Sequence, residues 1–300
     1  MRALVFTPDL TFADVPDPIP AADQVLVEVA AVSLNFGEVA YRSSAPRPSH
    51  VPGWDAAGVV ARAAADGSGP AVGTRVVTFG WSGAWAERRA VSTADLAVVP
   101  ADVDLALTAA LPVAGVTAFQ ALRRLGPIEG RRVLVTGASG GVGRFAVQLA
   151  AQAGAHVVAS VGGPQRAAGL RELGAAETVV GPEGLTERVY GVLDNVGGSQ
   201  LAEAFYRLED DGVVQAIGKA SKEPTVIDFE EARVRSLRGR IENFNIRAPF
   251  GDDLAHLVGL LATGDLDAQV GWRGPWDRAA EAARALLSRE VRGKAVLTLA

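Results

Sequence analysis

The segment from residue 133 to residue 143 joins an apolar run to a cluster of small residues, Val133-Leu-Val-Thr-Gly137-Ala-Ser-Gly140-Gly-Val-Gly143. A buried strand that turns sharply into a helix presents free N–H groups and a positive dipole end, and together these bind an anion. Glycines permit the turn, let a pyrophosphate approach the backbone and let the helix pack closely on the strand. The segment matches G-x-G-x-x-G except that alanine takes the first glycine position. It predicts a dinucleotide-binding loop with contacts from Ala138, Ser139, Gly140, Gly141, Val142 and Gly143.

The same residues allow other interpretations. Gly137-Ala-Ser139-Gly-Gly141 also matches the G-x-S-x-G nucleophile elbow of α/β-hydrolases, and Asp194 and His256 follow in the expected chain order. This interpretation makes Ser139 a nucleophile, but it gives no purpose to Gly143 or to the β-rich first hundred residues. A short-chain reductase would need a Tyr-x-x-x-Lys pair, and no tyrosine of this sequence has a lysine four residues later. A turn with packing duties alone is the simplest alternative, although its glycines cost backbone entropy.

The residues after the loop indicate which dinucleotide it binds. Loops specific for NAD place an acidic residue on the ribose hydroxyls about 20 residues further on. No Asp or Glu occurs between Arg131 and Arg171, and the second apolar run ends in Val161-Gly-Gly163, followed by Arg166. A guanidinium in a pocket without a carboxylate suits the 2′-phosphate of NADP. We therefore predict NADPH as the cofactor, with contacts from Gly163 and Arg166; the alternative for Arg166 is a solvated helix residue.

Alternating strands and helices have to position these residues. From about Leu111, helical stretches alternate with short apolar runs, which predicts βαβ units and a parallel sheet. Strands are expected at 132–136, 156–161, 178–180, 189–195 and 212–217, and helices at 142–153, 165–173 and 200–208. Asn195, Ile217 and Gly218 then fall at the carboxyl ends of strands, where an open α/β sheet binds its ligands.

The two ends of the chain differ from this middle part. The first hundred residues alternate short Val-, Ala- and Leu-rich runs with Pro and Gly clusters, which predicts a small β-barrel or sandwich. Near the other end, helices at 252–261 and 276–287 lead to a last strand at 294–299. In the sequence, this strand is too far from the strands of the predicted parallel sheet to be a simple continuation of that sheet. It could instead return to the first domain.

The composition narrows the range of functions. The chain has 300 residues, which suggests about two domains, and its net charge of -5 argues against a nucleic-acid partner. No apolar run approaches the roughly 20 residues that span a bilayer. The absence of cysteine excludes disulfides and thiolate zinc sites. Since the first residues also lack the apolar core of a signal peptide, a cytoplasmic location is the default expectation.

Several motifs along the chain occur together in one known family. The β-rich first part is followed by Leu111-Pro-Val-Ala-Gly115-Val-Thr117, the glycine loop, Asp194-Asn-Val-Gly-Gly198 and a closing Arg292-Gly-Lys-Ala-Val-Leu297. In this order they resemble the medium-chain dehydrogenase/reductase superfamily, specifically its zinc-free quinone oxidoreductase and enone reductase branch. The resemblance implies an α/β fold with a GroES-like β-rich catalytic domain (1–112 and 246–300). A Rossmann domain with a doubly wound parallel sheet (113–245) and a homodimer are implied as well.

The resemblance also implies a reaction without a metal. In the metal-dependent members, zinc ligands stand at positions that correspond here to Asn35, Trp54, Asp55 and Val113, and Asp55 alone cannot hold zinc. Without that Lewis acid, the expected substrate accepts hydride unaided: a quinone, or a double bond conjugated to a carbonyl. Hydride from NADPH would go to the β-carbon, and water or a nearby hydroxyl would protonate the enolate. A serine hydrolase and a dinucleotide-binding sensor or structural protein with little turnover stay open as alternatives.

A few further residues receive roles from the same resemblance. Asn35 matches a position beside the nicotinamide and would donate a hydrogen bond to a substrate carbonyl, with a turn-capping Asn as the alternative. Tyr41 is a candidate proton donor, although relatives with a tyrosine here place it at Ala40. Thr117 resembles a threonine near the cofactor, but its hydroxyl can also bond its own helix backbone. Four aromatic side chains could line a substrate pocket or pack in a core: Trp54, Trp81, Trp85 and Phe244.

Overall fold

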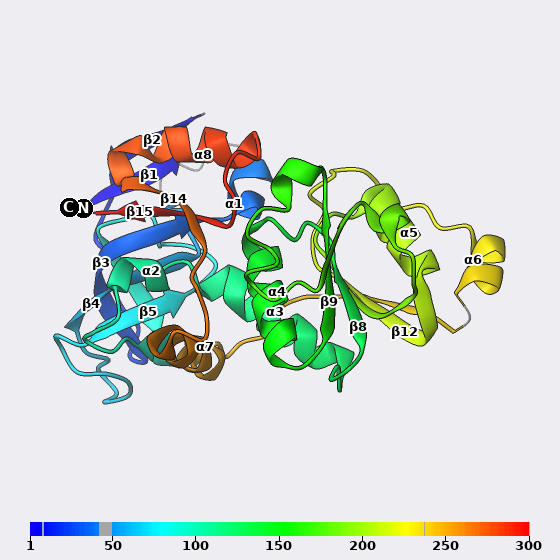
Figure 1. Cartoon of the computed structure of the whole chain (residues 1–300). Coiled ribbons are helices and arrows are strands. Elements are labelled where there is room, and N and C mark those ends of the chain that lie inside the picture. Colours follow the sequence, from blue (N-terminus) through cyan, green and yellow to red (C-terminus); the bar gives the residue numbers. More distant parts are fainter. Residues whose placement is uncertain (8, 42–49, 237, 300) are drawn as a thin grey trace. The chain divides into compact units, whose positions relative to one another are not determined.

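The chain folds into two compact units. The structure is a computed structural model that describes residues 1–7, 9–41, 50–236 and 238–299. The terminal unit consists of Met1–Val116 and Arg247–Ala300, and the central unit consists of Thr117–Ile246. Figure 1 labels many elements of both units. No helix in the described part of the chain is long and apolar enough to cross a bilayer.

A seven-stranded sheet forms the framework of the terminal unit. Its strands follow the order β14-β15-β3-β4-β5-β7, and β6 pairs with β3 beside this path. The first two strands form a separate antiparallel pair. The strands are β1 (Arg2–Phe6), β2 (Leu10–Asp14), β3 (Gln24–Leu34), β4 (Asp55–Arg62), β5 (Arg75–Phe79), β6 (Arg88–Ser92), β7 (Leu96–Val98), β14 (Val270–Pro275) and β15 (Lys294–Thr298).

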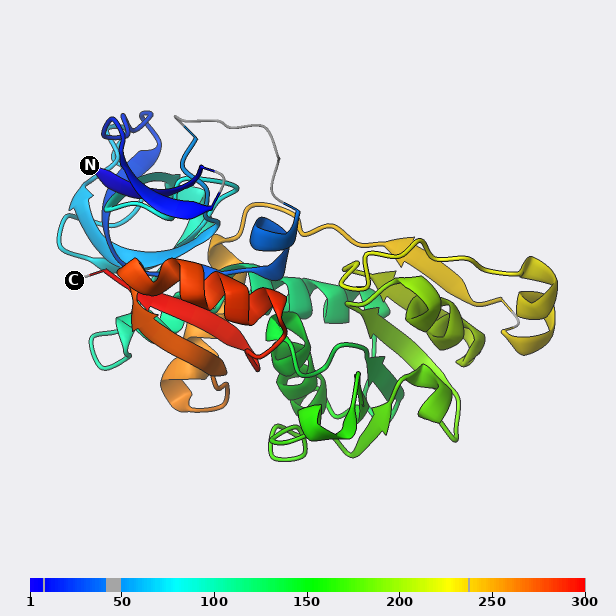
Figure 2. The same ribbon diagram turned by 90° about the horizontal axis from the view of Figure 1, so that it is seen from above.

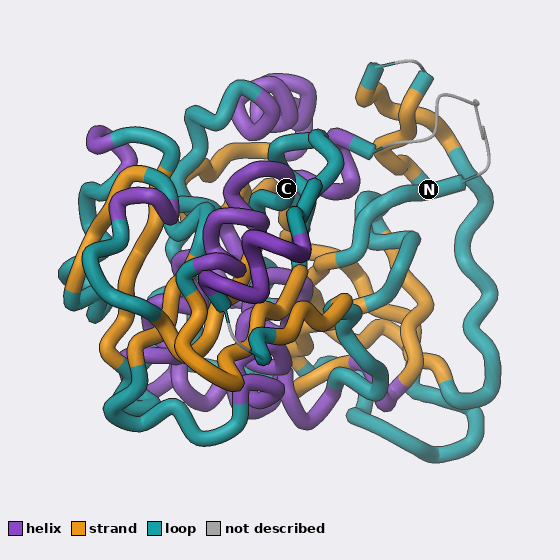
Figure 3. The backbone as a smooth tube through the Cα atoms, turned by 90° about the vertical axis from the view of Figure 1, so that its right-hand side faces the viewer, coloured by secondary structure: helices purple, strands orange, loops and turns teal. Residues whose placement is uncertain are grey.

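The last strand returns to the first part of the chain, as the sequence predicts. β15 pairs antiparallel with β3, with Ala295 opposite Leu34 and Thr298 opposite Ala31, so the red strand lies beside the blue one in Figure 1. On its other side β15 pairs parallel with β14, a strand that the sequence analysis does not predict. Residues from both ends of the chain therefore build one sheet, whose strands and loops can be followed in Figure 3.

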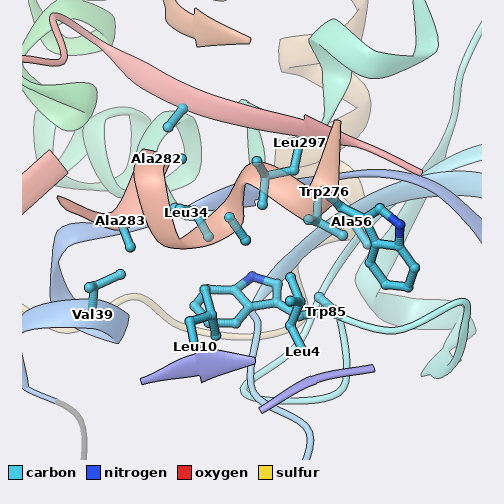
Figure 4. Packing of buried hydrophobic residues seen from close by; sticks show 14 of the residues in the cluster. Leu4, Leu10, Leu34, Val39, Ala56, Trp85, Trp276, Ala282, Ala283 and Leu297 are labelled. Carbon is cyan, nitrogen blue, oxygen red and sulfur yellow. The ribbon is translucent and has the colours of Figure 1, made fainter. Parts of the chain in front are cut away.

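Short helices and an aromatic core complete the terminal unit. The helical elements are α1 (Phe36–Ala40), η1 (Thr93–Asp95), α2 (Leu105–Thr108), α7 (Gly251–Thr263), η4 (Trp276–Arg278) and α8 (Ala279–Leu287). Trp85 is fully buried, and its indole N–H donates to the carbonyl of Ser33 (3.3 Å). Figure 4 shows this indole among core side chains such as Leu4, Leu34 and Trp276. Of the two roles considered for Trp85, the structure gives it the one in the core.

A six-stranded parallel sheet forms the central unit. Its order, β10-β9-β8-β11-β12-β13, is that of the predicted Rossmann fold. Its strands are β8 (Arg132–Val135), β9 (His156–Val161), β10 (Glu177–Val180), β11 (Val189–Asp194), β12 (Leu208–Ala216) and β13 (Arg240–Asn243). Its helical elements are α3 (Pro112–Leu125, which begins before the unit), α4 (Gly141–Gln152), η2 (Pro164–Arg166), η3 (Pro182–Gly184), α5 (Gly198–Tyr206) and α6 (Phe229–Arg235).

The direction of winding reverses between β8 and β11. Helix α4 follows β8, α5 follows β11, and right-handed crossovers in opposite directions place these helices on opposite faces of the sheet (Figure 1). An open sheet of this kind binds its ligands at the carboxyl ends of the strands where the reversal occurs. We therefore expect a ligand-binding site at the turns after β8 and β11.

The central unit differs from the prediction in one helix that does not form and in unpredicted elements, which include α3, α6 and β13. The helix predicted at 165–173 is wrong, because only the 3₁₀ turn η2 forms there and Gly169 adopts a φ of 79°, which a right-handed helix excludes. The strand β13 was not predicted. This strand lies parallel to β12, with Val213 opposite Arg240, and forms one edge of the sheet (Figure 2).

Candidate functional site

The glycine loop lies between β8 and α4 at the carboxyl edge of the central sheet. The chain leaves β8 after Val135 and turns at Gly137, which has a left-handed φ of 59°. A Cβ on Gly143 would lie 2.4 Å from the carbonyl oxygen of Gly137, so only glycine lets the helix come this close to the turn. No side chain caps α4 at Gly140, and its first N–H groups have no partner within the helix. The predicted loop residues, Ala138 to Gly143, thus have the geometry of an anion-binding turn.

Arg166 meets the glycine loop from the next crossover. It belongs to η2, which follows β9 and Gly163, and its Nε donates to Oγ of Ser139 (3.0 Å). The contact brings together two of the predicted cofactor residues from different segments of the chain. A guanidinium cannot accept a proton. The contact therefore does not supply the base that a nucleophilic serine requires.

Thr136 and Asp194 join the turns after β8 and β11. Oγ1 of Thr136 donates to Oδ1 of Asp194 (2.6 Å) and accepts from the backbone N–H of Asn195 (3.0 Å). Nδ2 of Asn195 donates to the carbonyl of Thr136 (2.9 Å). Asp194 is fully buried, and this burial raises its pKa. These bonds fix Asn195, a predicted cofactor residue, against the end of β8.

The turn after β12 belongs to the same group. The backbone N–H groups of Ile217 and Gly218 both donate to the carbonyl of Asp194, at 2.8 and 3.0 Å. A Cβ on Gly218 would lie 2.8 Å from the carbonyl oxygen of Asn195, so this approach needs glycine. Three predicted cofactor residues therefore lie together. The hydrogen bond between Thr136 and Asp194 was not predicted, although a polar residue at the end of each of two apolar strands was a signal for it.

A second group of polar side chains is buried in the terminal unit. Nζ of Lys294 donates to Oδ1 of Asn35 (2.5 Å) and to Oδ2 of Asp55 (3.2 Å). The side chains of Lys294 and Asp55 are 2% and 0% exposed. Nδ2 of Asn35 donates to Oε2 of Glu38 (2.9 Å) and to Oδ2 of Asp55 (2.8 Å). We call Asn35, Glu38, Asp55 and Lys294 the buried cluster.

The buried cluster uses both hydrogens of the Asn35 amide. Donation from Asn35 to a substrate carbonyl would first have to break one of these two bonds. The backbone N–H of Asn35 also donates to Oε2 of Glu38 (2.8 Å), which is the reach-back half of a capping box at the start of α1. The turn-capping alternative describes these contacts, and a direct role of Asn35 in the reaction stays a prediction.

The buried cluster does not suit a zinc ion. Of the four positions that correspond to zinc ligands, only Asp55 carries a suitable side chain, and its Oδ1 accepts from the backbone N–H of Val113 (3.0 Å). Its Oδ2 accepts from Ser33 (2.7 Å) and lies against the Lys294 ammonium, which already balances its charge. Within the described residues, no group of three or more His, Cys, Asp or Glu side chains could hold a metal ion.

Glu38 gives the buried cluster a dependence on pH. Burial, and next the repulsion from Asp55, raise the pKa of Glu38 from its ordinary 4.5 to about 8. Between these values the folded chain holds a proton that the unfolded chain has lost, so the free energy of unfolding should fall as pH rises. Urea denaturation of the wild type and Glu38→Gln across this window measures the effect. We expect the variant to lack this part of the slope, and an unchanged slope would contradict the assignment.

The remaining predicted site residues have simpler surroundings. Tyr41 ends α1, is 52% exposed, and meets the ring of Phe36 edge to face at 6.3 Å. Thr117 is a buried residue of α3, and Phe244 is buried beneath the guanidinium of Arg124 (5.2 Å). Tyr41 belongs to the terminal unit, whereas Thr117 and Phe244 belong to the central unit. Their roles in one common site stay predictions.

Two family models match this chain. The model of the alcohol dehydrogenase GroES-like domain matches residues 21–101. The model described as zinc-binding dehydrogenase matches residues 173–297. The first match lies within the terminal unit, which agrees with the GroES-like architecture predicted for it.

Curated relatives of several kinds match as well. The chain is 35% identical over 272 residues to Erythronolide synthase EryA2 of Saccharopolyspora erythraea. This match covers 85% of this chain but 7% of that protein. It is 30% identical over 289 residues to Prostaglandin reductase-3 of Mus musculus, covering 86% of this chain and 74% of that protein. It is 37% identical over 172 residues to the chloroplastic Quinone-oxidoreductase homolog of Spinacia oleracea, covering 52% of each. The chain thus spans a small part of the first relative and about half of the third.

Solved structures share the fold over the whole chain. Mycobacterial Rv1454c complexed with NADPH has a TM-score of 0.88 at 25% identity, covering 99% of this chain and 100% of that one. The quinone oxidoreductase from Coxiella burnetii has a TM-score of 0.84 at 25% identity, covering 100% of this chain and 99% of that one. With the two domain models and the reductase relative, these matches identify the family. The chain belongs to the medium-chain dehydrogenase/reductase superfamily, in its quinone oxidoreductase branch.

Proposed function

We propose that this protein is an NADPH-dependent oxidoreductase that transfers hydride, without zinc, to a quinone or to the conjugated double bond of an α,β-unsaturated carbonyl. One observation carries the proposal: Arg166 contacts Ser139 at a glycine loop that no acidic residue follows before residue 171. A serine hydrolase has less support, because Ser139 meets a guanidinium and the family consists of oxidoreductases.

Several groups of the central unit would bind the cofactor. The N–H groups of the glycine loop would hold the pyrophosphate, and Arg166 with Ser139 would bind the 2′-phosphate. Asn195, Ile217 and Gly218 would lie along the rest of the dinucleotide, at the carboxyl ends of β11 and β12. The mycobacterial relative in complex with NADPH supports this choice of cofactor. When bound, NADPH supplies the hydride.

The chemistry of the residues at and beside the buried cluster supports the proposed substrate class. Where metal-dependent relatives would bind zinc, this chain has an amide, an indole and a carboxylate paired with Lys294. Such groups do not polarise a simple ketone as a Lewis acid does. A quinone or an enone accepts hydride at carbon without that help, and the proton that completes the reduction would come from water or from the hydroxyl of Tyr41. The protein's part is to orient the two reactants and exclude water.

NADPH oxidation tests the proposal directly. The protein, dialysed against a chelator, should show energy transfer from tryptophan to NADPH and should oxidise NADPH when 9,10-phenanthrenequinone or an alkenal is added. Added zinc should not increase the rate, because the donor set around Asp55 does not suit it. Binding without turnover would favour a sensor, and a rate that depends on zinc would contradict the metal-free reaction.

The predicted homodimer belongs to the same proposal. The central sheet ends in the edge strand β13, where Ile241 is 37% exposed. The preceding segment exposes further apolar side chains, Val226, Phe229 and Val234. A second copy of the chain can cover such an edge across a twofold axis. Light scattering should give twice the chain mass of 31.0 kDa, and a monomeric mass would contradict this part. A cytoplasmic location stays a prediction.

A further inference from the structure

A buried arginine follows the glycine loop on α4. Arg144 comes directly after Gly143, and 7% of the residue is exposed. Arginine is rarely buried, because its charge loses its hydration and needs hydrogen bonds in exchange. An apolar side chain would pack a helix on a sheet at a lower cost. A guanidinium at this position therefore points to a contact that the protein needs.

The guanidinium of Arg144 contacts the segment that follows β9. Its Nη2 donates to the carbonyl of Ala168 (2.9 Å). A Cβ on Gly169 would lie 3.5 Å from Nη1 and 3.6 Å from Nη2, so the guanidinium lies directly against the backbone of this residue. Both residues belong to the stretch where a helix is predicted and does not form. Arg144 thus donates to an irregular turn, two residues beyond Arg166.

Packing fixes the far end of the same segment. Leu170 is fully buried, and a Cβ on Gly174 would lie 2.5 Å from the Cβ of Ala151, so only glycine lets the segment lie this close to α4. The contact of Arg144 with Ala168 extends this attachment toward η2. The segment is thereby held against α4 at both of its ends.

Arg166 lies at the near end of the segment, in η2. The backbone N–H of Ala167 donates to the carbonyl of Pro164 (3.1 Å), which closes this turn, and Nε of Arg166 reaches Ser139 (3.0 Å). A single 3₁₀ turn has few hydrogen bonds of its own, so its position depends on the chain that continues from it. Arg144 ties that chain to the helix whose start forms the glycine loop. One side chain of α4 thus connects the two parts of the predicted phosphate site.

We propose that Arg144 is a positioning residue for NADPH: its guanidinium fixes the turn that carries Arg166 and so sets the preference for the 2′-phosphate without touching the cofactor. The inference rests on the proposed function, because it assigns a specificity-determining residue to the same cofactor site. A side chain whose backbone is already fixed loses less conformational entropy when it binds a ligand. NADH gains nothing from this effect, because it has no 2′-phosphate for Arg166 to hold.

Binding of two dinucleotides to four proteins tests the proposal. Energy transfer from tryptophan gives the dissociation constants of NADPH and NADH for the wild type, Arg144→Met, Arg166→Ala and the double variant. Arg144→Met should raise the constant of NADPH by about fivefold, as expected when one more long side chain has to be ordered on binding, and leave that of NADH within about twofold. In the Arg166→Ala background the same substitution should change the constant of NADPH by less than about twofold, because Arg144 acts through Arg166.

Two further variants separate positioning from an effect on folding. Gly169→Ala strains a residue with a φ of 79°, so it should disturb the turn from the other side of the contact and cause the same selective loss of NADPH affinity. Arg132→Met serves as the matched control. It removes an arginine with a 14% exposed side chain from the first residue of β8, where it pairs with Glu177. Both dissociation constants should stay within about twofold in this variant, because distant sites act independently.

The possible outcomes distinguish this inference from the proposed function. No effect of Arg144→Met, or equal weakening of NADPH and NADH, would overturn the positioning role. An equal loss of NADPH affinity with and without Arg166 would also overturn it, because Arg144 would then act independently of Arg166. A selective loss that depends on Arg166, in a protein that turns over no acceptor, would support the positioning role and refute the reductase. A wild type that binds neither dinucleotide would refute the proposed cofactor and this inference together.

Discussion

Replacing Arg166 with alanine should raise the dissociation constant of NADPH by roughly ten- to hundredfold and leave that of NADH within about threefold. Arg166 reaches the glycine loop through Ser139, and a guanidinium forms charge-assisted hydrogen bonds to the phosphate that only NADPH carries. Energy transfer from tryptophan to the reduced nicotinamide measures both constants. The preference for NADPH should therefore shrink or vanish in this variant.

Arg171 provides the matched control for this experiment. It lies five residues further on, is exposed, and donates to the carbonyl of Ala176 (3.0 Å). Arg171→Ala removes the same charge from the same segment and should leave both constants within about twofold, since a solvated arginine contributes little. If Arg166→Ala weakens NADPH and NADH equally, the 2′-phosphate assignment is refuted.

Replacing Lys294 with methionine should lower the free energy of unfolding by about 3–5 kcal/mol. The ammonium is buried with Asp55, and its removal leaves a buried, ionised carboxylate that keeps its hydrogen bonds but loses the positive charge that balances it. It also takes the donor from Oδ1 of Asn35. Equilibrium denaturation in urea at neutral pH gives the difference.

A second substitution distinguishes lost charge balance from lost packing. Asp55→Asn added to Lys294→Met removes the unpaired carboxylate and should recover a large part of the stability, because most of the cost lies in that charge. Lys222→Met, at an exposed lysine of the central unit, should change stability by less than about 0.5 kcal/mol. A double variant no more stable than Lys294→Met alone would show that charge balance is not the cause.

The sequence predicts the glycine loop well because its signal is local. The apolar run, the turn and the helix start lie within eleven consecutive residues, and the close approach at Gly143 is a direct effect of a missing Cβ. The absence of an acidic residue near Arg166 can likewise be read without knowing the fold. The return of the last strand was predictable as well, because no neighbour was left for it in the parallel series.

Two of the strands that the sequence does not predict depend on a partner strand elsewhere in the chain. β13 is a four-residue edge strand with three polar side chains, and β14 contains two glycines and a proline, so neither has the composition of a strand. Each exists because β12 or β15 pairs with it. The helix predicted at 165–173 does not form, although most residues there favour a helix. Gly169 adopts a positive φ, which a right-handed helix excludes.

The buried cluster was beyond prediction for the same reason. Asp55 and Lys294 are 239 residues apart, and nothing near either residue indicates an ion pair. In the sequence alone, Asp55 is recognisable only as an insufficient zinc ligand, and Lys294 only as part of a closing motif. In the folded chain Asp55 and Lys294 form a buried ion pair, and both residues also form hydrogen bonds with the amide of Asn35.

The pairing of β15 with β3 has a consequence for synthesis on the ribosome. The central unit has all its strands once Asn243 has emerged, whereas the sheet of the terminal unit waits for Lys294 to Thr298. Until then one edge of β3 is open and Asp55 lacks its ammonium partner, and open strand edges favour aggregation of nascent chains. Strands β3 to β7 thus precede the central unit along the chain but complete their sheet after it.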